Sequence, residues 1–370
     1  MQQPDLRIII SGGGTGGHIF PAIAIADTLK KRIPDTKILF IGAKNKMEML
    51  RVPEAGYKIE GLWISGLQRN FSLRNLLFPI KLILSLIKAN KIIKKFKPSV
   101  VIGFGGYASG PALKAANWQN IPSLIQEQNS YPGITNRILA KKVNTICVAY
   151  TDMEKYFPKH KIVITGNPIR QDIIDIIGKK EKAYKYFELE NHKNTLLIVG
   201  GSQGSLAINK SIINHIDEFK GAQIQVIWQT GKLFFETAKK ACKTMQYERI
   251  RIFEFIDRMD YAYAIADMIV SRAGALAISE ICAVKKPSIL IPFPSAAEDH
   301  QTKNAMALVK KNAAVLIKNS DANQEVGKTI LSLFSDENKR KILSENIEKL
   351  SITDSADRIT DEIIKLIKQN

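Results

Sequence analysis

The residues best suited to chemistry in this 370-residue sequence lie in two glycine-rich segments, one of which is followed by a histidine. The first segment carries Gly12, Gly14 and Gly17 in the spacing G-x-G-x-x-G, with His18 next in sequence. Glycines permit a tight turn and close backbone approach, and the N-terminus of a following helix offers N–H groups to an anion. The segment therefore predicts a phosphate or pyrophosphate site with a titratable imidazole beside it.

Several common phosphate-binding classes do not fit these segments. NAD-binding domains carry an acidic residue after the second strand, whereas here that strand is expected to end at Ala43-Lys44-Asn45-Lys46. An NADP site could use Lys44, but the ending of the first loop, Gly17-His18, argues against it. Neither segment ends in the GK[ST] of a P-loop, which argues against an ATPase. The chain also contains no D-x-D triplet, the usual clamp for a metal-bound diphosphate.

Further polar residues gather where predicted strands end, which is where ligands bind in parallel sheets. These clusters are Gly103–Pro111, Gln126–Asn129 with Asn136, Gly166–Arg170, Ser271–Glu280 and Glu298–Asn304. Any one of them could be an ordinary polar turn. Their recurrence at successive strand ends favours a shared ligand-binding edge.

The elements that must position these clusters are short β-branched runs separated by helical segments. In the first half the predicted strands are Arg7–Ser11, Lys37–Gly42, Val100–Gly103, Ser123–Gln126, Thr145–Ala149 and Ile162–Gly166. In the second half they are Leu196–Gly200, Gln223–Gln229, Ile250–Phe253, Met268–Ser271, Ser288–Pro292 and Ala314–Lys318. Near-continuous apolar strands alternating with helices indicate parallel sheets covered on both faces. About a dozen strands suit two Rossmann-like α/β domains facing each other across a cleft.

A weak internal repeat supports this division. Arg7–His18 and Thr195–Ser205 each join a buried strand to a glycine-rich turn, about 190 residues apart, which is about one domain length. The boundary is expected at Gly166-Asn167-Pro168, giving domains 1–167 and 168–351. A C-terminal amphipathic helix is expected within about 352–370.

Composition and charge narrow the class of protein. Hydrophobic residues make up 45% and charged residues 24% of the chain, as in ordinary globular proteins. Three cysteines at distant positions, with no CxxC, favour a reducing cytoplasm. The formal charge is +19, and residues 1–167 carry 24 Lys and Arg against 9 Asp and Glu, a net +15. The first domain is therefore expected to face an anionic surface or substrate.

The candidate anionic partners are a membrane and a nucleic acid. The apolar run Leu76–Ile87 is twelve residues long and interrupted by Pro79 and Lys81, too short to span a bilayer. With the surrounding lysines, Leu67–Lys97 is predicted to form a peripheral membrane-docking surface. The lysine-rich end, Lys88–Lys97, holds a single aromatic residue and offers no stacking platform, which argues against nucleic acid.

Taken in order, the segments GGTGGH, GFGGYxSGP, EQN, GNPIR, GGSQG, SRAGA…SE and HQ…NA resemble the MurG family of bacterial glycosyltransferases. The resemblance implies a GT-B fold whose C-terminal helix returns to the N-terminal domain. It implies inverting transfer of N-acetylglucosamine from UDP-N-acetylglucosamine, without an essential metal or other cofactor. The implied acceptor is the 4-hydroxyl of undecaprenyl-pyrophosphoryl-muramyl-pentapeptide, held by the N-terminal domain at the cytoplasmic face of the inner membrane. The alternative is another GT-B glycosyltransferase acting on a glycolipid or natural product.

The resemblance also assigns candidate site residues. Those matching the family's first glycine loop and cleft are Thr15, Gly16, Gly17, Asn129 and Asn136. Those matching the donor site are Arg170, Ser202, Ile256, Arg272, Ala275, Leu276, Glu280 and Gln301. Among these, Arg170 and Ser202 are implied to hold the diphosphate, and Glu280 the ribose hydroxyls. Ile256 is implied to read the uracil through its backbone, and Gln301 to contact the sugar.

Two residues are candidates for the base that takes the acceptor proton. His18 is favoured because it follows the first glycine loop and the helix N-terminus there disfavours its cation. Glu127 is the second candidate, since a carboxylate in a closing cleft can have a raised pKa. Gln126 stands where the family commonly has a histidine, so that position supplies no base here.

Overall fold

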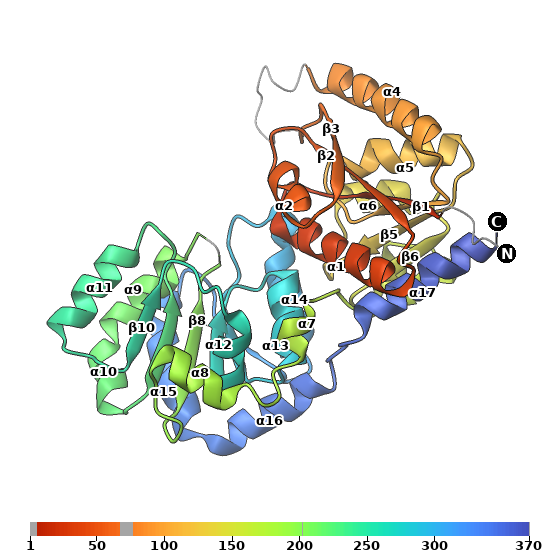
Figure 1. Cartoon of the computed structure of the whole chain (residues 1–370). Helices are drawn as coiled ribbons and strands as arrows, with labels where there is room; N and C mark the ends of the chain where they lie inside the picture. Colours follow the sequence, from red (N-terminus) through yellow and green to blue (C-terminus); the bar gives the residue numbers. More distant parts are fainter. Residues whose placement is uncertain (1–5, 67–76, 202, 370) are drawn as a thin grey trace. The chain divides into compact units, whose positions relative to one another are not determined.

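The computed structural model describes residues 6–66, 77–201 and 203–369. The chain divides into two compact units, Met1–Ile169 with Asp354–Asn370, and Arg170–Thr353. Each unit holds a parallel sheet with helices on both faces, which confirms the expectation of two Rossmann-like α/β domains (Figure 1). The C-terminal helix α17 (Ser355–Lys368) belongs to the first unit, where it packs against helix α1 (Gly16–Arg32).

The first unit is built on a sheet with strand order β3-β2-β1-β4-β5-β6-β7 within the described residues. Its strands are β1 (Arg7–Ser11), β2 (Lys37–Ala43), β3 (Lys58–Leu62), β4 (Val100–Gly103), β5 (Ser123–Glu127), β6 (Thr145–Val148) and β7 (Ile162–Ile164). All neighbouring pairs are parallel. Successive side chains enter opposite layers: Ile9 joins the core beneath the helices α4 (Phe78–Phe96), α5 (Ser109–Trp118) and α6 (Ile134–Leu139), while Ile8 joins the core beneath α1 and α17.

Strand β3 was not among the strands expected from the sequence. It lies at the edge of the sheet, paired only with β2 among the described strands. Lys58 and Glu60 are exposed, and Gly61 interrupts the apolar pattern. An edge strand needs fewer buried side chains than a central one, so its hydrophobic signal is weak.

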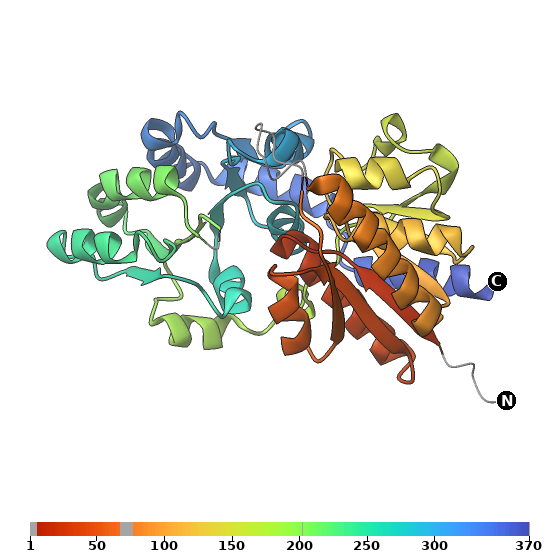
Figure 2. The same ribbon diagram turned by 90° about the horizontal axis from the view of Figure 1, so that it is seen from above.

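The second unit repeats this design in the described residues, with strand order β10-β9-β8-β11-β12-β13. Its strands are β8 (Thr195–Val199), β9 (Gln225–Gln229), β10 (Ile250–Phe253), β11 (Met268–Ser271), β12 (Ser288–Leu290) and β13 (Val315–Leu316). One face is covered by α8 (Lys180–Phe187), α12 (Met259–Ile265), α13 (Ala275–Ala283), α14 (His300–Val309) and α16 (Glu337–Glu348). The other is covered by α9 (Leu206–Asn214), α10 (Ile216–Gly221), α11 (Phe235–Thr244) and α15 (Ala322–Ser335), as the second view also shows (Figure 2).

Each glycine-rich segment follows the third strand from one edge of its sheet. In the first unit this strand is β1, beside β4, and in the second it is β8, beside β11. Chain connections leave in opposite directions at these two places, which is where ligands commonly bind in open parallel sheets. The internal repeat in the sequence thus corresponds to equivalent positions in two similar sheets. The cysteines Cys147, Cys242 and Cys282 are buried free thiols.

Candidate active site

In the first unit, His18 lies in the opening turn of α1, directly after the first glycine loop. Its Nδ1 is 3.0 Å from the Gly13 carbonyl oxygen and 3.3 Å from the Thr15 hydroxyl. A carbonyl oxygen can only accept, so Nδ1 carries a proton and donates it to Gly13. In the neutral ring, Nε2 then holds the basic lone pair.

The loop after β4 closes against the first glycine loop. A side chain at Gly105 would place its Cβ 3.0 Å from His18 Nε2, and one at Gly106 would lie 2.3 Å from the Gly13 carbonyl oxygen. Both glycines also have left-handed φ angles, 88° and 81°. Glycine at these positions therefore permits close contact between two loops and leaves room beside the imidazole.

Glu127, at the end of β5, is only 2% exposed and is surrounded by donors. Its Oε1 accepts from the backbone N–H of Asn129 at 3.0 Å and from that residue's side-chain amide at 3.2 Å. Its Oε2 accepts from the Gly133 N–H at 3.1 Å and from the Asn136 amide at 2.9 Å. Burial raises the pKa of Glu127, and these hydrogen bonds oppose that effect. Asn129 and Asn136 thus hold the carboxylate in place.

Gln126 belongs to a buried set of neutral amides at the same end of β5. It donates to the Asn167 side chain at 2.9 Å, and it accepts from Gln128. Asn167 in turn donates to the Gln128 backbone carbonyl at 3.0 Å. These hydrogen bonds give Gln126 a structural role at the end of β5.

In the second unit, Arg272 follows β11 and connects three loops. Its guanidinium donates to the Ile291 and Pro292 carbonyls at 3.1 and 3.0 Å, and to Asn319 at 2.8 Å. A fourth bond, 2.6 Å long, reaches the hydroxyl of Ser205, which lies beside the second glycine loop and caps α9. Burial lowers the pKa of Arg272 to about 10. These bonds hold the Arg272 guanidinium beside the second glycine loop.

Glu280, Tyr263 and Arg170 form a second group in this unit. The Tyr263 hydroxyl, on α12, donates to Glu280 Oε2 on α13 at 3.0 Å. Burial raises the pKa of Glu280 to about 6, although the Tyr263 hydrogen bond and the charge of Arg170 act in the opposite direction. A half-buried carboxylate with one oxygen held by tyrosine can accept hydrogen bonds from ligand hydroxyls with the other.

The remaining donor-site candidates of this unit lie in the loop at Ile256 and in the first turns of α13 and α14. Gln229, which the sequence analysis did not single out, accepts from the Ile256 N–H and donates to the Gly201 carbonyl, both at 2.9 Å. Gln301 accepts from the Phe293 N–H at 2.9 Å. Ala275 and Leu276 form the first turn of α13. These residues follow strand ends of one sheet, as expected. Ser202 lies outside the described residues.

The comparisons with protein families match both halves of the chain. The glycosyltransferase family 28 N-terminal domain matches residues 8–148, and the glycosyltransferase family 28 C-terminal domain matches residues 195–359. The chain belongs to glycosyltransferase family 28. This membership accounts for two Rossmann-like domains with separate glycine loops, and it makes the protein a glycosyltransferase.

Individual relatives of this family 28 chain carry one specific name. A protein of Parabacteroides distasonis is 54% identical over 361 residues, 98% of each chain, and is named UDP-N-acetylglucosamine–N-acetylmuramyl-(pentapeptide) pyrophosphoryl-undecaprenol N-acetylglucosamine transferase. A Flavobacterium psychrophilum protein of the same name is 53% identical over 362 residues, again 98% of each chain. The crystal structure of Acinetobacter baumannii MurG superposes with a TM-score of 0.79 at 26% identity, covering 97% of this chain and 99% of that one. The MurG resemblance is thereby confirmed.

Proposed function

We propose that this family 28 enzyme transfers N-acetylglucosamine from UDP-N-acetylglucosamine to undecaprenyl-pyrophosphoryl-muramyl-pentapeptide, the lipid-linked step of peptidoglycan synthesis. The observation that carries the proposal is the 54% identity over 98% of a relative named for this transfer. Two groups of the second unit suit a nucleotide sugar. They are Arg272, which forms no ion pair with a carboxylate among the described residues, and Glu280, whose free oxygen could accept from ribose hydroxyls.

The proposed reaction is a single displacement that inverts the anomeric carbon. The acceptor 4-hydroxyl oxygen bonds to that carbon as the bond to the UDP oxygen breaks, and the hydroxyl proton passes to a base. We assign this base to His18, because the Gly13 carbonyl holds its proton on Nδ1 and leaves Nε2 as the acceptor. Glu127 remains the second candidate, but both its oxygens already accept two hydrogen bonds.

The donor assignments follow the groups of the second unit. Arg170 and Arg272, with the second glycine loop, would stabilise the diphosphate that departs with uridine. Glu280 would accept from the ribose hydroxyls. The Ile256 N–H already donates to the Gln229 side chain. The uracil would therefore donate a hydrogen bond to the Ile256 carbonyl. Gln301 and the start of α13 at Ala275 would border the sugar and nucleoside.

The direct test is transfer of radiolabelled N-acetylglucosamine to lipid-linked muramyl-pentapeptide in chelator-treated enzyme. We expect product with UDP-N-acetylglucosamine and little with UDP-glucose, with no need for added magnesium. Transfer to an unrelated glycolipid or natural product, but not to the muramyl acceptor, would favour the alternative GT-B activity. An absolute requirement for magnesium would contradict metal-free stabilisation of the diphosphate.

Glu280→Gln should weaken UDP-N-acetylglucosamine binding by about 10- to 100-fold at pH 7.5, because a charged acceptor typically contributes about 1.5–3 kcal/mol. The native protein should also lose donor affinity as pH falls through about 6, where Glu280 becomes protonated. The variant should lack that pH dependence. Calorimetry from pH 5 to pH 8 checks both effects, with exposed Glu345→Gln as the matched control. An unchanged dissociation constant would remove Glu280 from the ribose site.

Arg170→Ala should raise the donor KM by about 10- to 100-fold through the loss of a charge-assisted bond to phosphate. It should also move the pH dependence of donor binding to higher pH, because the charge of Arg170 normally lowers the pKa of Glu280. Exposed Lys240→Ala in the same unit is the control for loss of one positive charge. Full kcat/KM in Arg170→Ala would show that other groups hold the diphosphate.

We further propose that the first unit docks peripherally on the anionic cytoplasmic face of the inner membrane through α4. The inner side of this helix is buried at Ser85, Ala89 and Ile93. Its outer side exposes the apolar row Ile80, Ile83, Leu84 and Ile87. Within the described residues no helix has the length and hydrophobicity to cross a membrane. Residues 67–76 of the docking segment expected from the sequence lie outside those residues.

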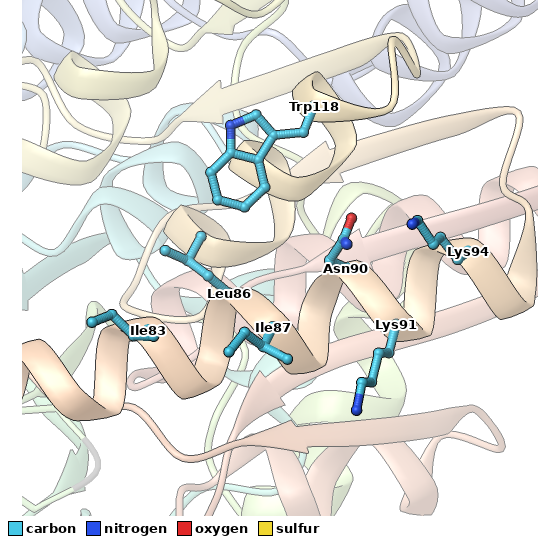
Figure 3. A pocket seen from close by; sticks show the side chains of 7 residues that line it. All are labelled: Ile83, Leu86, Ile87, Asn90, Lys91, Lys94 and Trp118. Atoms are coloured by element: carbon cyan, nitrogen blue, oxygen red, sulfur yellow. The ribbon is translucent and has the colours of Figure 1, made fainter.

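A groove along α4 combines the apolar and basic groups that an anionic membrane surface would contact (Figure 3). Its lining residues are Ile83, Leu86, Ile87, Asn90, Lys91, Lys94 and Trp118. Trp118 comes from α5 and is 54% exposed, comparable to Ile83 at 57%. An exposed indole beside aliphatic side chains and lysines suits the boundary between lipid headgroups and acyl chains.

A further inference from the structure

Glu48 is a buried carboxylate behind the first glycine loop. It is the first residue of α2 (Glu48–Glu54), which packs against β2 and α1, and it is 1% exposed. Its Oε1 accepts from the Ala43 N–H and its Oε2 from the Gly14 N–H, both at 2.9 Å. Within the described residues it pairs with no lysine or arginine. Its two hydrogen bonds therefore join the end of β2 to the glycine loop.

The loop glycines are shaped around this carboxylate. A Cβ at Gly13 would lie 2.1 Å from Glu48 Oε1, and one at Gly42 would lie 2.5 Å from Glu48 Cγ. Gly14 has a φ of 88°, and its N–H is bonded to Glu48. Part of the glycine pattern thus makes room for a protein side chain, and the Gly14 N–H is committed to that side chain.

The same hydrogen bonds reach His18 through one peptide unit. The Gly13 carbonyl belongs to the peptide whose N–H, that of Gly14, donates to Glu48. That carbonyl accepts from His18 Nδ1 at 3.0 Å. When Glu48 fixes the orientation of this peptide, it fixes the direction of the carbonyl and hence the proton on Nδ1.

We propose that Glu48 is a positioning residue that holds His18 in the Nδ1–H tautomer through the Gly13–Gly14 peptide. This inference rests on the proposed role of His18 as base, and it adds the group that keeps the basic lone pair of the neutral ring on Nε2. Glu48 itself touches no substrate in this scheme, because both oxygens bond to backbone N–H groups.

The test is Glu48→Gln in the full-length enzyme. The glutamine amide has a single oxygen, so it can accept from only one of the two N–H groups, those of Ala43 and Gly14. Its NH₂ group must then face the remaining N–H. We expect kcat to fall about 10- to 100-fold, as activity does when the groups that orient metal-bound histidines are lost. We expect the ¹⁵N spectrum of neutral His18, assigned with His18→Asn, to change from Nδ1–H toward a mixture containing Nε2–H. Donor binding to the second unit should not change.

The matched control is Glu54→Gln, the same chemical change at an exposed position of the same helix. It should alter neither the His18 spectrum nor kcat. Calorimetry with UDP-N-acetylglucosamine and a thermal melt identify variants that have lost the fold. Glu48→Asp provides a second variant, because its shorter carboxylate keeps the charge but cannot reach both N–H groups; it should show a partial shift of the same kind.

Different results would contradict the positioning role of Glu48 and the role of His18 as base. An unchanged His18 tautomer and an unchanged kcat in folded Glu48→Gln would overturn the positioning role, whatever His18 does. Full activity of His18→Ala would refute the base instead, while a tautomer shift in Glu48→Gln would still show that Glu48 orients the ring. If both roles hold, Glu48→Gln should cause no further loss of kcat in a His18→Ala background.

Discussion

Replacing His18 with alanine is expected to lower kcat by about 100-fold or more, because removal of a general base typically costs 10²–10⁴-fold in rate. Binding of UDP-N-acetylglucosamine should remain unchanged, since the proposed donor groups belong to the second unit. Steady-state transfer kinetics at saturating donor and acceptor, with calorimetry of donor binding, measure the two quantities separately.

The variant His18→Asn tests whether His18 acts as a base or only forms a hydrogen bond to the loop. The asparagine amide nitrogen can take the place of Nδ1 and still donate to the Gly13 carbonyl, but the side chain cannot accept a proton. If His18 is the base, this variant should be as slow as His18→Ala. Activity near the native level in His18→Asn would instead show that the residue only organises the loop.

Glu127→Gln is the comparison for the second candidate base. Its amide would turn an NH₂ toward backbone and side-chain donors, so we expect a loss of about 1–3 kcal/mol in stability. The kcat of the folded variant should fall less than that of His18→Ala. The reverse order of the two variants, with Glu127→Gln still folded by thermal melt, would transfer the role of base to Glu127.

The triple variant Ile83→Ser, Ile87→Ser and Trp118→Ser is expected to abolish flotation with anionic liposomes. These side chains are exposed in the groove along α4, so their loss should remove apolar contact with lipid while costing little stability. Donor binding and the thermal melt should match those of the native protein. The control replaces Ile177 and Ile342 with serine, two exposed apolar residues of the second unit.

Charge reversal at Lys91 and Lys94 tests the electrostatic part of the same surface. Each basic residue near an anionic membrane contributes roughly 1 kcal/mol, so Lys91→Glu with Lys94→Glu should weaken liposome binding by at least about tenfold. The native interaction should weaken as salt is raised, and the variant should show less dependence on salt. Native flotation by both the serine and the glutamate variants would place the docking surface elsewhere.

The sequence alone determined the features that depend on residues close together in the chain, which are the buried strands, the glycine loops and the order of the motifs. Buried strands such as Arg7–Ser11 and Met268–Ser271 appear as continuous apolar runs, because both faces of a parallel sheet are covered. The glycine loops follow those strands directly, and His18 follows the first loop. The order of these short motifs also indicated the family, which the family comparisons confirmed. Strand β3 was missed because its alternating charges and Gly61 resemble a loop.

What only the tertiary structure decided is which distant side chains hold those motifs in place. Glu48 bonds to Gly14 across 34 positions, Gln229 to Ile256 across 27, and Tyr263 to Glu280 across 17. Trp118 meets α4 only because α5 packs beside it. No local pattern marks such partners, since a carboxylate or amide has the same sequence signature whether it is solvated or buried against backbone donors. Their roles follow from the packing of a parallel sheet, which brings the ends of separate strands together and leaves each buried polar group in need of a partner.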